Sequence, residues 1–176
     1  MRRYTRRMNE GPIPANITIR LASAEDTHEI TRTYLESAEY HALLDPERYS
    51  VPAPETITAR YREGRQHPSH TEGTSITLVA EVGGEIVGFI DARLERSPDP
   101  MHREMLYCHI VEFAVSLAHQ GQGIGQQLLG AAEDWGRGQG AELASLEYLT
   151  ANTRAGSFYQ QRMGYRPAAI TAIKRL

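Results

Sequence analysis

The segment from Gln120 to Gly125, Gln-Gly-Gln-Gly-Ile-Gly, is where residue types and spacing most clearly favour chemistry. It follows a predicted strand that ends at Val115 and leads into a helix expected from about Ile124 to Gly136. Such a loop gathers several backbone N–H groups, and the helix behind it adds the positive end of its dipole. Glycines are required because a side chain would obstruct an anion or forbid a positive φ. The sequence therefore predicts a phosphate-binding loop that needs no basic side chain.

Two common phosphate-binding motifs do not fit this loop. A P-loop ends in Gly-Lys-Ser/Thr, whereas Gly125 is followed by Gln126 and Gln127. A dinucleotide-binding fingerprint needs a third glycine at the position of Gln126. The pattern that remains is Gln-x-x-Gly-x-Gly, formed by Gln120, Gly123 and Gly125. An ordinary glycine-rich turn between a strand and a helix is the alternative, and residues further along the chain decide between the two.

Composition is that of an ordinary globular protein. The 176 residues suffice for one domain with a core, and 40% are hydrophobic against 23% charged. A net charge of −3 favours neither a nucleic-acid partner nor a membrane surface. The single cysteine, Cys108, allows no internal disulfide, and the seven histidines are too scattered to predict a metal site. We therefore expect no metal. No apolar run approaches the roughly 20 residues of a membrane span, and we expect a cytoplasmic protein.

Hydrophobic periodicity and turn residues predict one mixed α/β domain over residues 16–176, preceded by a flexible basic tail at 1–15. A capping box, Ser23 with Asp26, opens the first helix. Strands are expected at 17–21, 75–82, 85–94, 105–115, 143–149 and 170–174. Helices are expected from this capping box to about residue 41, and at about 55–65, 124–136 and 153–163.

The last third of the chain carries further matches to one known family. These matches are Asn152, Ala155, Phe158-Tyr159 and Gly164-Tyr165. With the glycine loop they follow the order and spacing of the GNAT (Gcn5-related) N-acetyltransferases, which the chain resembles from about residue 75 to its end. The resemblance implies the GNAT fold, a mixed α+β structure whose central, mostly antiparallel sheet contains two splayed parallel strands and is flanked by helices. One departure is Leu117, where the family often has proline.

The resemblance also implies acetyl-CoA as a co-substrate, bound where two parallel strands separate with the help of a bulge. These strands would end at Val115 and Leu149, and the pyrophosphate would lie on the glycine loop. Asn152 would bridge a splayed strand to the cofactor arm, although it could simply cap a helix. The implied cofactor-binding residues are Phe113, Ala114, Val115, Gln120, Gly121, Gln122, Gly123, Ile124, Gly125, Gln126, Asn152 and Tyr159.

Transfer of an acetyl group to an amine needs a base for the amine and a proton donor for the leaving thiolate. Tyr159 occupies the donor position of the family, with a packed aromatic as the alternative. Glu112 and Glu147 are the candidate bases, although either could be a solvated carboxylate. His109 lies on the strand of Glu112, with the opposite pleat parity in a regular strand.

The segment from Glu39 to Glu55 would form the wall of the acceptor site, if the family pattern holds. His41, Asp45 and Tyr49 are its candidate substrate-binding residues, and its acidic character favours a cationic amine. A solvated connector is the alternative. The sequence thus predicts an N-acetyltransferase whose acceptor is a small-molecule or peptide amine. A non-catalytic acyl-CoA sensor, transfer of a longer acyl group and a homodimer all stay open.

Overall fold

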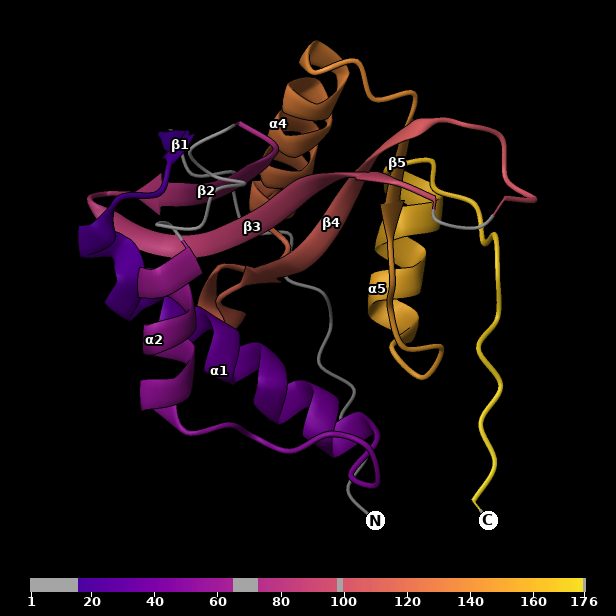
Figure 1. The fold of residues 1–176 in the computed structure, drawn as a ribbon. Helices are drawn as coiled ribbons and strands as arrows, with labels where there is room; N and C mark the ends of the chain where they lie inside the picture. Colours follow the sequence, from indigo (N-terminus) through magenta and orange to yellow (C-terminus); the bar gives the residue numbers. More distant parts are fainter. Residues whose placement is uncertain (1–15, 65–72, 98–99, 176) are drawn as a thin grey trace.

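Five strands form one mixed sheet in the computed structural model, which describes residues 16–64, 73–97 and 100–175 (Figure 1). The sheet order is the chain order, and each neighbouring pair is antiparallel except β4 and β5, which are parallel. The predicted basic tail, 1–15, lies outside the described residues. The strands are β1 Ile17–Leu21, β2 Ser75–Val82, β3 Glu85–Arg96, β4 Leu106–Val115 and β5 Leu143–Leu146.

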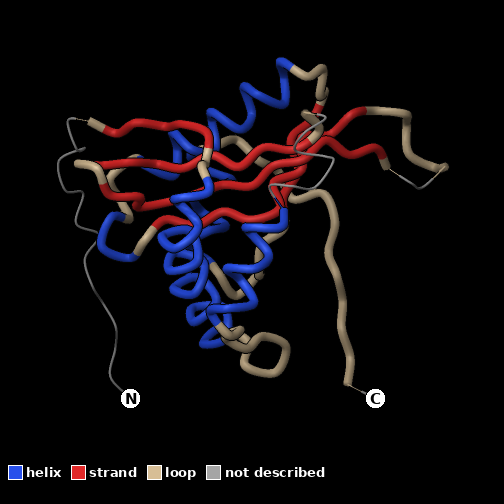
Figure 2. The backbone as a smooth tube through the Cα atoms, turned by 60° about the vertical axis from the view of Figure 1, so that its left-hand side comes forward, coloured by secondary structure: helices blue, strands red, loops and turns tan. Residues whose placement is uncertain are grey.

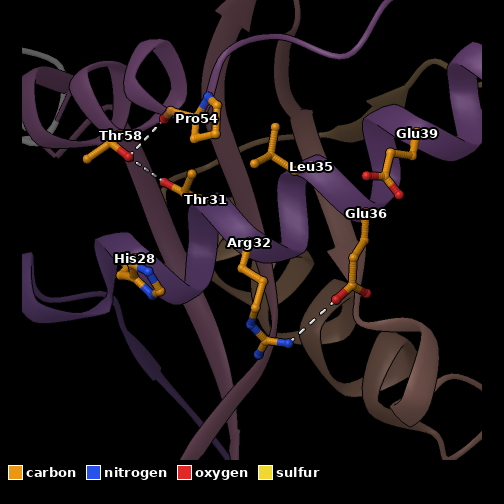
Figure 3. Close-up of a pocket in the computed structure, with 8 residues that line it drawn as sticks. All are labelled: His28, Thr31, Arg32, Leu35, Glu36, Glu39, Pro54 and Thr58. Atoms are coloured by element: carbon orange, nitrogen blue, oxygen red, sulfur yellow. Dashed lines mark hydrogen bonds and ion pairs between the residues drawn. The ribbon is translucent and has the colours of Figure 1, made fainter.

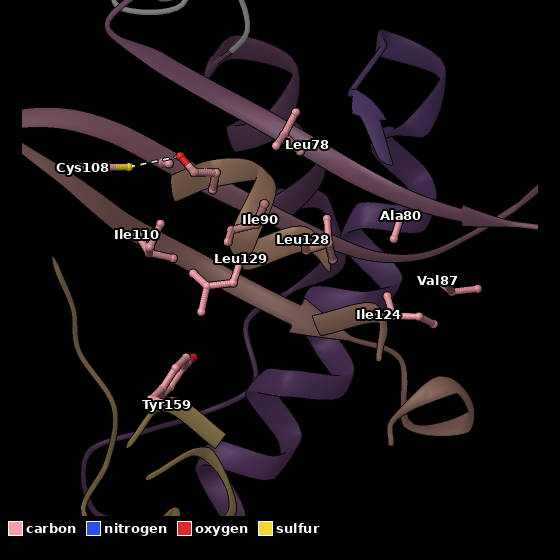
Figure 4. Packing of buried hydrophobic residues seen from close by; sticks show 12 residues of the cluster. Leu78, Ala80, Val87, Ile90, Cys108, Ile110, Ile124, Leu128, Leu129 and Tyr159 are labelled. Carbon is pink, nitrogen blue, oxygen red and sulfur yellow. Dashed lines mark hydrogen bonds between the residues drawn. The ribbon is translucent and has the colours of Figure 1, made fainter. Parts of the chain in front are cut away.

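Helices lie on both sides of the strands (Figure 2). On one side are α1, Thr27–Leu44, and α2, Pro54–Gly64; on the other are α4, Ile124–Gly138, and α5, Thr153–Ser157. The core under α4 consists of Leu78, Ala80, Val87, Ile90, Ala92, Cys108, Ile110, Ile124, Leu128, Leu129, Ala132 and Tyr159 (Figure 4). The core under α1 and α2 consists of Ile30, Ile57, Tyr61, Val79, Ile86 and Phe89. No helix in the described ranges is long and apolar enough to cross a membrane.

The predicted capping box is present where the chain passes from β1 toward α1. The carboxylate of Asp26 accepts from the backbone N–H of Ser23 at 2.6 Å and from its hydroxyl at 3.0 Å. Arg20 adds two bonds of 2.8 Å to the same carboxylate and thereby holds the pKa of Asp26 at about 2. The start of α1 is therefore fixed to β1 by one buried acidic residue.

A β-bulge in β4 is the irregularity that matters most for the site. Asp91 of β3 pairs with Glu112 of β4, whereas Ala92 pairs with Ile110, so Val111 is an extra residue. The extra residue shifts the alternation of side chains along the strand. Glu112 and His109 therefore share the α1–α2 face of the sheet, and the opposite parity expected for a regular strand is wrong.

Three predicted elements end or continue differently in the structure. β5 stops at Leu146 instead of Leu149. The last helix is α-helical only over Thr153–Ser157 and continues as a π-helical turn, Phe158–Arg162. The strand expected at 170–174 is wrong, because this part of the chain lies outside the sheet and is exposed. Its two isoleucines are three positions apart, so a strand here would have no single apolar face.

Candidate active site

The glycine loop after β4 has the backbone geometry that an anion site needs. Gly121 and Gly123 have φ values of +82° and +80°, which residues with a side chain rarely adopt. Gly125 has a different reason, because a Cβ there would lie 3.1 Å from the ring of Phe113. The glycine pattern is therefore explained position by position.

The N-terminus of α4 points its free N–H groups at this loop. Gly123 is the N-cap and offers no side chain, and the first turn, from Ile124 to Gln127, is uncharged. The unpaired N–H groups and the helix dipole thus remain available to an anion. Gln120 contributes differently, since its side chain donates to the carbonyl of Val115 at 2.8 Å and braces the loop.

The sheet separates beside the loop. β4 and β5 are paired only from Tyr107 to Ile110 on β4, whereas β4 continues to Val115 along β3. The backbone N–H of Ser116 donates to Val87 at 2.8 Å, toward β3. In an antiparallel ladder alternate residues face the same neighbour, so Phe113 and Val115 present their backbone groups to the open side, and Ala114 faces β3. The separation begins at the bulge and leaves an extended slot toward which the backbone of Phe113 and Val115 faces, with the carbonyl of Val115 already bonded to Gln120.

Tyr159 lies next to this slot within a cluster of aromatic rings. The Tyr159 residue is 8% exposed, and burial raises the pKa of its phenol to about 12. Its ring centroid lies 5.4 Å from that of Tyr148, 6.0 Å from that of Tyr165 and 6.3 Å from that of Phe113. The π-helical turn lets the backbone N–H of Tyr165 donate to the carbonyl of Tyr159 at 2.9 Å. Tyr159 is therefore protonated at neutral pH and points toward β4 (Figure 4).

Asn152 and Glu147 lie in the chain that follows β5. Asn152 caps α5, since its Oδ1 accepts from the backbone N–H of Ala155 at 3.0 Å. The helix-cap interpretation is thus realised, and a role toward the cofactor stays a prediction. Glu147 comes directly after the last paired residue of β5 and is exposed.

Glu112 lies on the opposite face of the sheet, in a polar cluster covered by α1 and α2. Its carboxylate is 3.3 Å from Nη1 of Arg60 on α2, and its cross-strand neighbour is Asp91. Asp91 accepts a 2.6 Å hydrogen bond from the hydroxyl of Thr77. Burial raises the pKa of Glu112, Arg60 lowers it, Asp91 raises it and His41 lowers it. Glu112 is therefore a half-buried carboxylate adjusted by charges on three elements.

Aromatic rings surround the guanidinium of Arg60. The carbon of this group lies 5.8 Å from the ring centroids of both Tyr34 on α1 and Tyr61 on α2. Burial raises the pKa of both phenols. Sequence reasoning missed Arg60 and Asp91. The sequence pattern places Arg60 on a helix and Asp91 on a strand. It does not show that both face Glu112, because this depends on the strand pairing and on the bulge in β4.

The predicted acceptor residues gather at the C-terminal end of α1. The His41 and Tyr49 ring centroids are 5.6 Å apart, and Nδ1 of His41 donates to the carbonyl of Ser37 at 2.8 Å. Asp45 forms an ion pair with Arg48, whose Nε lies 2.6 Å from the Asp45 carboxylate. This pairing lowers the pKa of Asp45. Glu47 pairs in turn with Arg175 at 2.7 Å. The structure brings the three predicted side chains together, but local arginines offset the acidic character of the segment.

No group of His, Cys, Asp and Glu residues suited to a metal is present among the described residues. What the two sides of β4 offer is a slot with backbone donors, a protonated phenol on one face and a carboxylate on the other. These two sides of β4 together form the candidate active site.

A family model, described as the acetyltransferase (GNAT) family, matches residues 28–165. The chain belongs to this family, and the resemblance inferred from the sequence is confirmed. A search of curated protein sequences gives no significant match.

Solved structures share the fold at low sequence identity. A single-residue mutant of the BH1408 protein from Bacillus halodurans superposes with a TM-score of 0.81 at 22% identity, covering 90% of this chain and 99% of that one. AAC(6')-Iy, in complex with the bisubstrate analogue CoA-S-monomethyl-acetylneamine, gives a TM-score of 0.65 at 18% identity, with 92% of this chain and 100% of that one covered. Glucosamine-6-phosphate N-acetyltransferase from Arabidopsis thaliana gives 0.61 at 15%, with 91% and 98% covered. The predicted mixed sheet with a parallel pair is thereby confirmed.

Proposed function

We propose that the protein is an N-acetyltransferase that moves an acetyl group from acetyl-CoA to a primary amine by direct attack in a ternary complex. The observation that carries the proposal is the separation of β4 from β5 at the Val111 bulge, next to a glycine loop and an uncapped helix N-terminus. An extended pantetheine arm needs backbone partners along a slot, and a pyrophosphate needs N–H groups at its end. The end of β4 and the glycine loop that follows it supply these two kinds of partner.

The pyrophosphate would lie on Gly121 to Gln126, and the pantetheine amides would bond the backbone of Phe113 and Val115. One N–H of this strand would polarise the thioester carbonyl, an interaction that strengthens when a bound cofactor displaces water from the slot. A family-level role and a neighbour crystallised with a CoA analogue support acetyl-CoA as the acetyl donor.

Glu112 serves as the base in this proposal. A carboxylate takes a proton from the incoming ammonium, directly or through water, and burial moves its pKa toward the working pH. Arg60 opposes that shift and favours the ionised carboxylate. The neutral amine nitrogen then attacks the carbonyl carbon, and the carbon–sulfur bond breaks as the amide forms. The nitrogen gives up a second proton, which returns through solvent to the acid that protonates the thiolate, and Glu112 releases its own proton to solvent.

Tyr159 serves as the acid that protonates the leaving thiolate. Its phenol is protonated at neutral pH because burial raises its pKa to about 12. Glu112 and Tyr159 lie on opposite faces of the sheet, and β4 runs between them beyond its last pairing with β5. The acceptor thus enters from the α1–α2 side, while the thiolate is protonated from the α5 side.

The test is a panel of amines incubated with the protein and acetyl-CoA, with thiol release as the readout and calorimetry for binding. We expect acetyl-CoA to bind and at least one amine to release thiol at a saturable rate. The panel includes aminoglycosides and amino sugars, because structural neighbours carry those activities in their names. Binding without turnover on every amine would favour a non-catalytic acyl-CoA sensor, and no binding would refute the proposal.

A further inference from the structure

A hydrogen bond joins α1 to the start of the glycine loop. The carboxylate of Glu36 accepts from the backbone N–H of Leu117 at 2.9 Å, across 81 positions of sequence. Glu36 is one of the residues that line the groove along α1, and Figure 3 shows its side chain extended toward Arg32. This bond links the helix that leads to the acceptor segment with the loop that receives the pyrophosphate.

Glu36 is itself held in place by an arginine. Arg32, one turn earlier on α1, lies 3.5 Å from the other carboxylate oxygen of Glu36. The same guanidinium also binds Glu85 at 3.1 Å and the carbonyl of Ile86 at 3.2 Å, at the start of β3. Glu36 is therefore oriented by a contact that reaches the sheet. Arg32 also offsets a negative charge that would by itself repel an anion in the loop.

Leu117 needs such a partner because it begins a short 3₁₀ helix, Leu117–His119. The first N–H groups of a helix have no partner inside the helix. The Leu117 residue is 61% exposed, so packing does little to hold it. The neighbouring Ser116 is fixed by its own bonds, with its N–H on Val87 and its hydroxyl 2.9 Å from the ring of His119. The Glu36 bond is what extends this order to Leu117.

We propose that Glu36 is a positioning residue that fixes the start of the cofactor loop through the N–H of Leu117. The proposal rests on the proposed function, because it assumes that this loop receives the pyrophosphate of acetyl-CoA. In its absence the loop samples more conformations, and binding must select the competent one. Glu36 touches no reacting atom, so its effect falls on the affinity for acetyl-CoA and not on turnover at saturation.

The backbone at Leu117 offers a direct way to replace the Glu36 bond. Ser116 has φ −54° and ψ 144°, the extended conformation that a residue before proline requires. Leu117 is the first position of the 3₁₀ helix, where proline is well tolerated since its missing N–H and fixed φ suit the site. Leu117→Pro therefore removes the N–H that donates to Glu36, and it fixes the φ angle of residue 117.

The experiment measures acetyl-CoA affinity by calorimetry and steady-state rates for six variants, one of them Leu117→Pro alone. Glu36→Ala should bind acetyl-CoA about tenfold more weakly with an unchanged kcat, about 1.4 kcal/mol in binding free energy. Glu36→Gln keeps an acceptor oxygen and should bind within about twofold of the parent protein. In the Leu117→Pro background, Glu36→Ala should have no further effect. Glu39→Ala, nearly one turn along α1, and Leu117→Ala are the matched controls and should bind normally.

Hydrogen exchange of the free proteins supplies a readout that needs no cofactor. Peptides covering residues 116–120 should exchange faster in Glu36→Ala and should not in Glu39→Ala. Parent-like affinity and exchange in Glu36→Ala, or the same loss in the proline background, would overturn the proposal. If the parent protein binds no acetyl-CoA, the proposed function fails on its own, and the exchange data still decide whether Glu36 holds the loop.

Discussion

The proposed cofactor side and the proposed acceptor side of β4 differ in the groups that form them. On the cofactor side, backbone groups form the site: positive φ angles at Gly121 and Gly123 and the free N–H groups of α4. On the acceptor side, side chains from several elements form it, with Arg60 from α2, Asp91 from β3 and Glu112 from β4. In the proposed function, the first kind of site would recognise a feature that every CoA thioester shares, whereas the second could change by single substitutions. Donor binding would then be generic and acceptor choice local.

Glu112→Gln should produce the largest loss of activity. If it weakened acetyl-CoA binding, the division between a cofactor side and an acceptor side of β4 would be wrong. We expect kcat/KM to fall about a hundredfold or more, as for loss of a general base, with acetyl-CoA affinity unchanged. Burial raises the pKa of Glu112, and the protonated carboxyl cannot accept a proton. Activity of the parent protein should therefore decline as the pH falls through this pKa, and the variant should lack that limb. Glu147→Gln is the control, and a larger loss there would make Glu147 the base.

Gly123→Val should act on the cofactor side alone. Valine at φ +80° strains the backbone, and its side chain would intrude on the anion site. We expect acetyl-CoA to bind at least about tenfold more weakly by calorimetry, about 1.4 kcal/mol. Gly130→Ala is a matched control, because Gly130 lies within α4 and an added Cβ meets open space. Equal losses in both variants would mean that general destabilisation is responsible, and not the loop geometry.

Tyr159→Phe should sharpen the comparison by separating the chemical step from binding. The phenol is needed when the thiolate leaves, so kcat should fall about tenfold while acetyl-CoA affinity stays the same. Tyr148→Phe is the control, since its ring lies 5.4 Å from that of Tyr159 and its hydroxyl accepts from Gln160 at 2.7 Å. An unchanged rate in Tyr159→Phe would leave this residue with a packing role only.

Removing His41, Asp45 and Tyr49 one at a time should have the smallest effect. Asp45 is already paired with Arg48. His41 donates to the carbonyl of Ser37, and its ring lies against the ring of Tyr49. We expect KM for the best amine to rise about threefold at saturating acetyl-CoA, about 0.6 kcal/mol. Steady-state kinetics with a cationic and a neutral amine will measure it. The acceptor would enter elsewhere if all three variants kept the parent KM for both amines.

The cofactor side could be predicted from sequence because its determinants are local. Glycine spacing, the helix start and the capping box each act within a few residues, so they are readable without a fold. Gly83 and Gly84, which separate the expected strands 75–82 and 85–94, are readable for the same reason, and both have positive φ.

The acceptor side could not be predicted to the same depth, because its determinants are long-range. The pairing of Arg60 with Glu112 depends on how α2 packs over the sheet, and Asp91 meets Glu112 only through the β3–β4 register. The bulge at Val111 carries no composition signal, and it moved His109 to the face of Glu112. The π-helical turn at Phe158–Arg162 was missed for a similar reason, since tertiary packing decides it.

The extra residue at Val111 also bears on how such a strand can evolve. Deleting Val111 would restore regular alternation and turn the carboxylate of Glu112 relative to the part of β4 before it. A single codon gained or lost is enough to move an acidic group from one face of a sheet to the other, with no change in the identity of any remaining side chain. In this fold, length polymorphism within a strand is thus a route to new chemistry that substitution alone does not provide. Variants of one residue in length deserve as much attention in engineering this site as changes of residue type.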